Sequence, residues 1–314
     1  MEHRQLGTSD LNVSKVGLGT WALGGDFFGE TDDQRSIGAI QAAVDHGINL
    51  IDTAPAYGDG HSEKVVGQAI KGRRDDVIIA TKCGIKRDGK EFHITLKPDS
   101  VRQEVDDSLR RLDIDVIDLY QIHWPDKDTP IEDTLEALLE AQQAGKFRYL
   151  GLSNFNPTLM DEVSEIADFV SLQPQYSLLH RKIEGGTLPY CRKNNIGVLS
   201  YGTLAGGILT GKFKEIPDFD EEDRRSDFYD FFKEPTWRKV QQLLDVLRDI
   251  AAKRNVPVPQ VVINWTTQQP GITTALVGAK NAEQAESNAG SGDWNLTNDE
   301  LSKIADSYQD IFGK

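Results

Sequence analysis

Ile51-Asp52-Thr53-Ala54-Pro55-Ala56-Tyr57-Gly58 leaves an apolar run and turns abruptly polar. The residues before it, 47–51, are predicted to form a short buried strand, and Gly58-Asp59-Gly60-His61 is typical of a turn before a helix that begins at Ser62. Asp52 and Tyr57 therefore follow the end of a strand. In a parallel α/β fold, the loops at that end of the sheet carry the chemistry. The alternative is structural, with Asp52 capping a turn and Tyr57 packing over the rim.

Short apolar runs alternate with longer amphipathic segments along most of the chain, and this alternation is typical of βα units around a parallel sheet. Eight such units in series predict a (β/α)8 TIM barrel, with a doubly wound open sheet as the alternative. No linker divides the sequence, so residues 1–314 are expected to form a single domain. The expected strands are residues 13–18, 47–51, 77–81, 116–122, 147–152, 169–173, 197–200 and 273–277.

Two segments depart from this alternation. Residues 202–235 form a long, charged loop between the seventh strand and its helix, and loops of this length are usually functional or poorly ordered. Residues 297–312 are predicted to form an extra C-terminal helix. Two helix boundaries are predicted by a capping-box pattern at Thr31-x-x-Gln34 and by a terminating Gly145.

The composition excludes several classes of function. With 50 acidic and 35 basic residues the net charge is −15, which opposes binding to nucleic acid or to an anionic membrane. No apolar run approaches the roughly 20 residues that cross a bilayer, and the amino terminus lacks the plan of a signal peptide. The sequence has only two cysteines, Cys83 and Cys191, and they lie far apart. A disulfide framework is therefore not expected, which fits a reducing compartment. We therefore expect a cytoplasmic protein, and the sequence leaves its oligomeric state open.

Two glycine motifs are similar to phosphate-binding loops but incomplete. Gly17-x-Gly19-x-x-Ala22 follows a predicted strand as a dinucleotide fingerprint does, yet the Gly-rich residues 24–29 cannot sustain the helix that this motif requires. Gly206-x4-Gly211-Lys212 has the spacing of a P-loop, yet Phe213 replaces the Ser or Thr that holds magnesium. A tight turn beneath a ligand explains the first motif better. The second leaves a loop that offers N–H groups to a phosphate, or a flexible surface loop.

Charged and aromatic side chains follow three neighbouring strands. Lys82 ends the third expected strand and shares its side-chain parity with Ala80, and His123 ends the fourth. Asp52 and Tyr57 follow the second. Because neighbouring strands lie about 4.8 Å apart, these four side chains are expected to meet at the mouth of the barrel.

An Asp, a Lys, a Tyr and a His at one mouth point to general acid catalysis by tyrosine. A free phenol, with a pKa of about 10, exchanges its proton slowly near neutrality, and a nearby ammonium lowers that pKa. Asp52 would hold Lys82 in place, and a neutral His123 would orient a substrate oxygen. The sequence contains neither G-x-S-x-G nor H-E-x-x-H, so we expect no covalent nucleophile and no metal site.

Five motifs spread over five strand ends resemble the signatures of the aldo-keto reductases. They are Asp52-Thr53-Ala54-Pro55-Ala56-Tyr57-Gly58, Thr81-Lys82, Tyr120-Gln121-Ile122-His123-Trp124-Pro125, Gly151-Leu152-Ser153-Asn154-Phe155 and Leu276-Val277-Gly278-Ala279-Lys280. The sequence is most similar to the bacterial general-stress-type and inositol-catabolism-type members. The resemblance implies a (β/α)8 barrel that reduces aldehydes or ketones to alcohols, with NADPH bound across its mouth and no Rossmann fold.

The resemblance also implies roles for individual residues. Tyr57 is expected to donate the proton, Asp52 and Lys82 to tune it, and His123 to orient the carbonyl group. Trp21 and Trp124 are expected beside Tyr57 and His123 in the substrate pocket. The expected contacts to NADPH (NADP+) are Gly19, Thr20, Trp21 and Asp52 near the nicotinamide; Ser153, Asn154, Gln173 and Tyr201 around its carboxamide and ring; Gly202, Thr203, Leu204, Ala205, Gly206, Gly207, Leu209 and Lys212 along the pyrophosphate; and Arg225, Gly278, Ala279, Lys280, Gln284 and Asn288 at the adenosine end.

Two positions depart from the family pattern. The arginine of the long loop is either Arg224 or Arg225, and Arg225 fits the spacing to the following aromatic stretch better. Gln284 stands where many animal relatives carry an arginine, so the grip on a 2′-phosphate rests on Lys280 and the loop cations. This weakens the expectation of strict NADPH use.

The sequence does not identify the small-molecule carbonyl substrate. An aromatic-lined pocket is suggested by Trp21, Phe27, Phe28, Trp124 and Tyr229, although each could equally be rim packing. Two other functions stay open at this point. One is a non-catalytic nicotinamide-binding sensor of the same fold, and the other is a barrel isomerase or lyase acting on a phosphorylated sugar.

We predict that carbonyl reduction survives exhaustive treatment with EDTA, because the sequence shows no cluster of metal ligands. The measurement is the rate of NADPH oxidation before and after treatment, with a mock-treated sample as the control. Activity that EDTA removes and zinc restores contradicts the metal-free mechanism.

Overall fold

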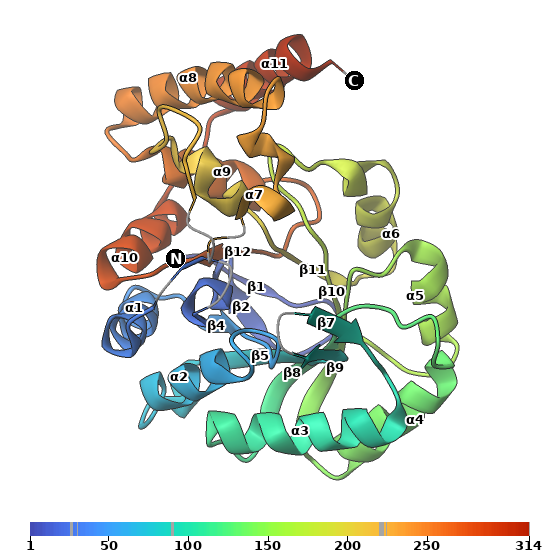
Figure 1. Ribbon diagram of the computed structural model, residues 1–314. Helices are drawn as coiled ribbons and strands as arrows, with labels where there is room; N and C mark the ends of the chain where they lie inside the picture. Colours follow the sequence, from blue (N-terminus) through green and yellow to red (C-terminus); the bar gives the residue numbers. More distant parts are fainter. Residues whose placement is uncertain (26–27, 30, 89–90, 220–222, 224, 314) are drawn as a thin grey trace.

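Eight parallel strands close into a barrel in the computed structural model (Figure 1), which describes residues 1–25, 28–29, 31–88, 91–219, 223 and 225–313. This closure confirms the predicted (β/α)8 TIM barrel and excludes the open sheet. The barrel strands are β3 (Val16–Gly19), β4 (Leu50–Asp52), β5 (Ile78–Cys83), β8 (Ile117–Ile122), β9 (Phe147–Ser153), β10 (Ser171–Gln173), β11 (Gly197–Ser200) and β12 (Thr274–Gly278).

Helices surround the barrel, and two long ones, α8 (Thr236–Arg254) and α11 (Asn298–Phe312), pack side by side beyond it (Figure 1). α11 confirms the predicted C-terminal helix. No helix in the described part of the chain is long and apolar enough to span a membrane. The other helices are α1 (Asp33–Asp45), α2 (His61–Ala69), α3 (Pro98–Leu112), α4 (Ile131–Gln143), α5 (Pro157–Ser164), α6 (Thr187–Lys193), α7 (Arg225–Phe228), α9 (Val258–Thr267) and α10 (Ala282–Gly290).

The helix boundaries agree in part with the sequence signals. The carboxylate of Asp32 accepts a hydrogen bond from the backbone N–H of Arg35 and caps α1, so the capping box predicted at Thr31 is wrong. The reason is that Asp is at least as good an N-cap as Thr and stands one residue nearer the helix. Gly145 follows α4 with φ +76°, the left-handed conformation that ends a helix, which confirms the predicted stop.

The alternation of side chains along the strands divides the apolar core into two layers. Leu50, Ala80, Leu119 and Leu276 fill the interior of the barrel, whereas the outward-facing residues pack against the helices. Lys82 is two residues after Ala80 on β5, and therefore continues this interior row toward the carboxyl end of the barrel. The parity predicted for Lys82 is confirmed.

Two hairpins add to the expected elements. The strand expected at residues 13–18 is divided: β2 (Asn12–Ser14) pairs with β1 (His3–Gln5), and only β3 joins the barrel. Leu6 and Leu11 of the first hairpin belong to the interior apolar cluster, so this hairpin closes the amino-terminal end. β6 (Ile85–Asp88) and β7 (Glu91–Ile94) form the second, after β5. Neither is predicted above, because strands of three or four residues are too short to show a periodic pattern.

Candidate active site

A buried ion pair lies at the carboxyl ends of β4 and β5. Lys82 Nζ donates to Asp52 Oδ1 at 2.8 Å, to Asp52 Oδ2 at 2.7 Å and to the carbonyl oxygen of Thr53 at 3.0 Å. Lys82 is 0% exposed and Asp52 is 3% exposed. Because a buried charge without a partner is strongly unfavourable, neither residue could be buried in its charged form without the other.

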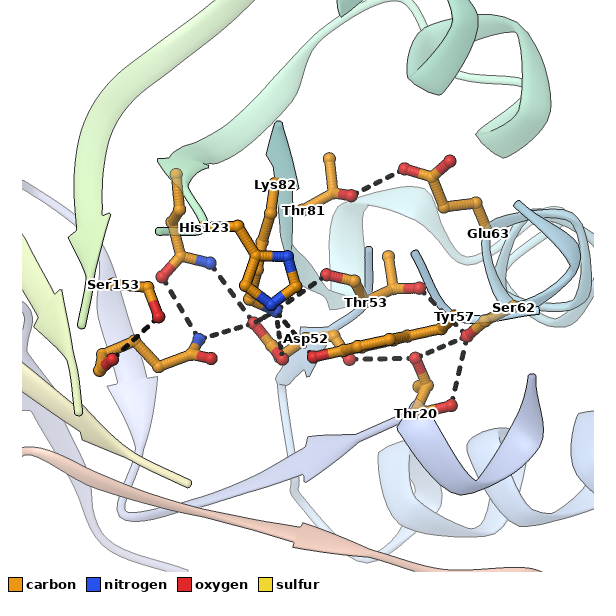
Figure 2. A network of polar contacts seen from close by, with 12 residues as sticks. Thr20, Asp52, Thr53, Tyr57, Ser62, Glu63, Thr81, Lys82, His123 and Ser153 are labelled. Atoms are coloured by element: carbon orange, nitrogen blue, oxygen red, sulfur yellow. Dashed lines mark hydrogen bonds and ion pairs between the residues drawn. The ribbon is translucent and has the colours of Figure 1, made fainter. Parts of the chain in front are cut away.

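Tyr57 places its hydroxyl against the same ammonium. Its oxygen lies 3.2 Å from Lys82 Nζ, and the ring of His123 stands edge-on to the Tyr57 ring with centroids 6.0 Å apart (Figure 2). On another side, Trp21 stacks on Tyr57 with centroids 6.0 Å apart and an angle of 23° between the rings. The structure thus brings Asp52, Tyr57, Lys82 and His123 together, as the sequence predicts.

Hydroxyl groups fix the loop that connects Asp52 to Tyr57. Thr20 Oγ1 donates to the carbonyl oxygen of Asp52 at 2.9 Å, and Ser62 Oγ donates to Thr20 Oγ1 at 2.7 Å (Figure 2). The turn itself requires glycine: Gly58 has φ +64°, and a Cβ there would lie 1.9 Å from the carbonyl oxygen of Gly24. The position of Tyr57 is therefore set by contacts on both sides of its loop.

Burial and charge determine the protonation of the groups around Tyr57. Burial lowers the pKa of His123 well below its ordinary value, and the positive charge of Lys82 lowers it further, so the imidazole is neutral near pH 7. Burial also lowers the pKa of Lys82, while the adjacent Asp52 opposes this shift and favours the ammonium form.

A polar cluster at the ends of β9 and β10 connects to this ion pair. Asn154, with φ +64°, donates from Nδ2 to Ser153 Oγ at 3.0 Å, and its Oδ1 accepts from the Tyr201 hydroxyl at 3.0 Å. Gln173 Nε2 donates to Asp52 Oδ1 at 2.7 Å. An amide oxygen has two lone pairs, so Asn154 Oδ1 can accept a second hydrogen bond beside that of Tyr201, which fits the amino group of a carboxamide.

A cavity of about 660 Å³ opens above these residues, within the size range of small-molecule sites. It is bordered by the ends of the barrel strands, the long loop after β11 and the start of α10. The predicted site residues that line it are Gly19, Trp21, Asp52, Tyr57, His123, Trp124, Ser153, Asn154, Gln173, Tyr201, Gly202, Thr203, Leu204, Ala205, Gly206, Gly207, Lys212, Arg225, Gly278, Lys280, Gln284 and Asn288.

Among the residues that the structure describes, three cations line this cavity: Lys212, Arg225 and Lys280. Burial lowers the pKa values of Lys212 and Lys280, and the positive charge of Arg225 lowers both further. Arg225 pairs with Asp223 and donates to the carbonyl oxygen of Gly206 at 3.2 Å, and Lys280 Nζ donates to the carbonyl oxygen of Phe28. Cations that repel one another at a cavity wall favour an anionic ligand. Arg224, the alternative to Arg225, lies outside the described residues.

The two glycine motifs adopt short 3₁₀ turns. Residues Trp21–Leu23 form such a turn after β3, so no dinucleotide-binding helix opens there. Residues Ala205–Thr210 form another, interrupted at Gly206 and Gly207, which have φ +68° and +91°. A Cβ at Gly206 would lie 2.7 Å from the ring of Tyr229, so this loop packs too closely for any larger residue.

Four predicted residues do not line the cavity. Lys82 lies beneath it, enclosed by Asp52 and Thr53. Thr20 is 0% exposed, and its hydroxyl donates to the carbonyl oxygen of Asp52. Leu209 and Ala279 are 0% and 1% exposed and belong to the apolar core, so the structure does not bring their side chains to a ligand.

Several lining residues are absent from the predicted set. Glu283 and Ser287 lie on α10, each one residue before a predicted residue, Gln284 or Asn288. Their spacing of four residues places them together near the same face of the helix, and this is a signal that the sequence contains. Phe92 of β7 and Phe228 of α7 have no periodic signal around them. Phe28 and Tyr229, which the sequence left open, line the cavity, whereas Phe27 lies outside the described residues.

In the described ranges, no group of three or more His, Cys, Asp or Glu side chains is placed to hold a metal ion. The structure is a closed barrel with an ion pair, a tyrosine and an imidazole at its mouth. Residues 15–309 match the model of the Aldo/keto reductase family, and the chain belongs to this family of oxidoreductases. The predicted resemblance is confirmed.

Two curated relatives align along nearly their whole length. The chain is 40% identical to Aldo-keto reductase YhdN of Bacillus subtilis (strain 168), with 97% of this chain and 92% of the relative covered. It is 36% identical to the NADH-specific methylglyoxal reductase of Escherichia coli (strain K12), with 95% of each chain covered.

Solved structures agree with these relatives. The glycerol dehydrogenase AKR11B4 from Gluconobacter oxydans superposes with a TM-score of 0.91 at 38% identity, covering 100% of this chain and 97% of that chain. An aldo-keto reductase from Klebsiella pneumoniae in complex with NADPH superposes with a TM-score of 0.77 at 28% identity, covering 98% and 95%.

Proposed function

We propose that the protein reduces the carbonyl group of a small molecule with NADPH, and that Tyr57 gives the proton to the carbonyl oxygen. The observation that carries this proposal is the distance of 3.2 Å between the Tyr57 hydroxyl and Lys82 Nζ. When bound, the cofactor supplies the hydride. The buried ammonium stabilises the phenolate that is left once the proton has moved, and Asp52 holds the ammonium in place.

His123 completes the proposed machinery. Its neutral imidazole stands beside Tyr57 and offers an N–H to the substrate oxygen, which aligns that oxygen with the phenol. Membership of an oxidoreductase family opposes an isomerase or lyase acting on a phosphorylated sugar. All four side chains are present and are linked from Asp52 through Lys82 and Tyr57 to His123, which opposes a non-catalytic sensor.

The cavity supports a dinucleotide phosphate as the cofactor. Ser153, Asn154 and Gln173 would hold the carboxamide, and the ring of Tyr201 would face the nicotinamide. Lys212, Arg225 and Lys280 would hold the phosphates, because charge-assisted contacts to phosphate oxygens are strong. These cations favour NADPH, while Glu283, which also lines the cavity three residues after Lys280, opposes a 2′-phosphate.

The rim of the cavity supports a substrate with an apolar or aromatic body. Trp21 lies edge-on to Phe28 and Phe228, with centroids 5.2 and 5.4 Å away. Phe92, Trp124 and Phe228 are 37%, 38% and 48% exposed although they line the cavity. Exposed aromatic rings at a cavity gain burial when an apolar ligand covers them. We further propose a cytoplasmic location, which agrees with two buried free thiols, Cys83 and Cys191.

We predict that Tyr57→Phe lowers kcat by about 10²–10⁴ and changes NADPH affinity by only a few fold, because the acid is lost while the ring still packs. Turnover and cofactor titration by fluorescence are the measurements. Tyr308→Phe, on α11, is the matched control. Retention of near-normal turnover in Tyr57→Phe removes Tyr57 from the mechanism.

We predict that the wild-type protein prefers NADPH and that Lys280→Met largely removes this preference. The loss should come from a roughly tenfold to hundredfold weaker use of NADPH, with NADH little changed, since a charge-assisted bond is typically worth about 1.5–3 kcal/mol. Steady-state kinetics with both cofactors measure it, and Lys303→Met on α11 is the control. An unchanged ratio of NADPH to NADH use would sink the assignment of Lys280.

We predict that benzaldehyde is reduced with a higher kcat/KM than glyceraldehyde, because the rim offers aromatic faces to an apolar body. Phe228→Ala should lower kcat/KM for benzaldehyde by about threefold to tenfold and leave glyceraldehyde nearly unchanged. Ile166→Ala, an exposed apolar residue outside the cavity, is the control. Equal losses for both aldehydes speak against an aromatic substrate subsite.

A further inference from the structure

Gln121 is a buried amide that the proposed chemistry does not use. It lies on β8, two residues after Leu119, and is 0% exposed. Its Nε2 donates to Asp52 Oδ1 at 3.2 Å, and its Oε1 accepts from Gln173 Nε2 at 3.2 Å. Gln173 Nε2 also donates to Asp52 Oδ1, at 2.7 Å. Two amides and one carboxylate therefore form a closed triangle beneath the cavity.

The carboxylate fixes the direction of every bond in this triangle. An ionised carboxylate only accepts hydrogen bonds, so both amide nitrogens must face Asp52. The second N–H of Gln173 is then directed to Gln121 Oε1. As a result Asp52 Oδ1 accepts from Lys82, Gln121 and Gln173, whereas within the described residues Oδ2 accepts from Lys82 alone.

We propose that Gln121 is a positioning residue, which shares the negative charge of Asp52 and so leaves more of the positive charge of Lys82 to act on Tyr57. Hydrogen bonds to an ionised acceptor are strong, and the low dielectric of a buried site strengthens them further. Without this donor, only Lys82 and Gln173 would compensate the charge of Asp52, and the share of Lys82 would be larger. The ammonium would then stabilise the phenolate of Tyr57 less.

The other groups that act on Tyr57 stay in place when Gln121 is replaced. His123 is neutral, and Tyr201 and Tyr229 lie on other elements, near enough to Tyr57 to interact with it electrostatically. Glu63 acts on Lys82 from α2, where Thr81 and Arg111 bind its two carboxylate oxygens at 2.6 and 2.5 Å. Among the described residues Gln121 hydrogen-bonds through its side chain to Asp52 and Gln173 and to none of these groups, so a change in the acid can be assigned to Asp52.

The test is the pH dependence of kcat/KM for carbonyl reduction in Gln121→Met. A general acid loses activity as the pH rises through its pKa, and a less favoured phenolate raises that pKa. The alkaline limb should therefore move upward by about half a pH unit, which is a roughly threefold change in proton affinity and the scale of one hydrogen bond. Leu119→Met, on the same strand and the same interior face, should leave the limb unchanged.

Gln121→Asn is a second variant, in case the apolar replacement fails to fold. Its amide is one methylene shorter and cannot reach Asp52, so the alkaline limb should move in the same direction. A limb that stays at its wild-type position in the folded variants overturns the proposal. A loss of activity that is uniform with pH also overturns it, because that is the signature of a merely structural role.

This inference rests on the proposed role of Tyr57 as the acid, and the two can fail separately. If Tyr57→Phe retains turnover, the proposed function of Tyr57 fails whatever Gln121 does. If Tyr57→Phe is inactive while the Gln121 variants keep the wild-type limb, only the role of Gln121 fails.

Discussion

The contact between Lys82 and Asp52 is the one on which the rest of the site depends. Taking two charges out of water costs several kcal/mol for each, and removing either partner of such a pair is typically destabilising by about 3–5 kcal/mol. The pair is tolerated because it also forms hydrogen bonds with the backbone of Thr53 and with the amides of Gln121 and Gln173. These groups come from β4, β5, β8 and β10, so the site exists only when the barrel is closed.

The barrel also explains why Tyr57 can be held beside this pair on a loop. The backbone of the loop is tied to the end of β3 through Thr20 and to the start of α2 through Ser62. The close approach of Gly24 and Gly58 leaves no room for the turn to move inward. A loop fastened on both sides keeps the phenol at a fixed distance from the ammonium, which is the preorganisation that acid catalysis requires.

A residue could be placed from the sequence where a regular pattern determines its position, and not where its position depends on a short element or on a long-range contact. Lys82 and His123 could be placed because strand alternation and sequential barrel order are strong rules. The hairpin β6–β7 and helix α7 could not be predicted, because elements of four residues show no periodicity. The lining residues Phe92 and Phe228 lie on these elements and were therefore not predicted either. The contact of Gln121 with Asp52 joins positions 69 residues apart. It depends on the register between strands, which cannot be predicted from this sequence alone.

The enclosed ion pair and the aromatic rim also differ in how much a substitution would disturb them. The ion pair and its amides are enclosed, so almost any substitution there leaves a buried charge or polar group without a partner. The aromatic rim comes from segments outside the barrel strands, where a substitution alters only the surface offered to a ligand. Proteins 36–40% identical to this chain over nearly its whole length carry names as different as methylglyoxal reductase and glycerol dehydrogenase. For this reason the substrate has to be inferred from the rim of this chain and not from the identity to its relatives.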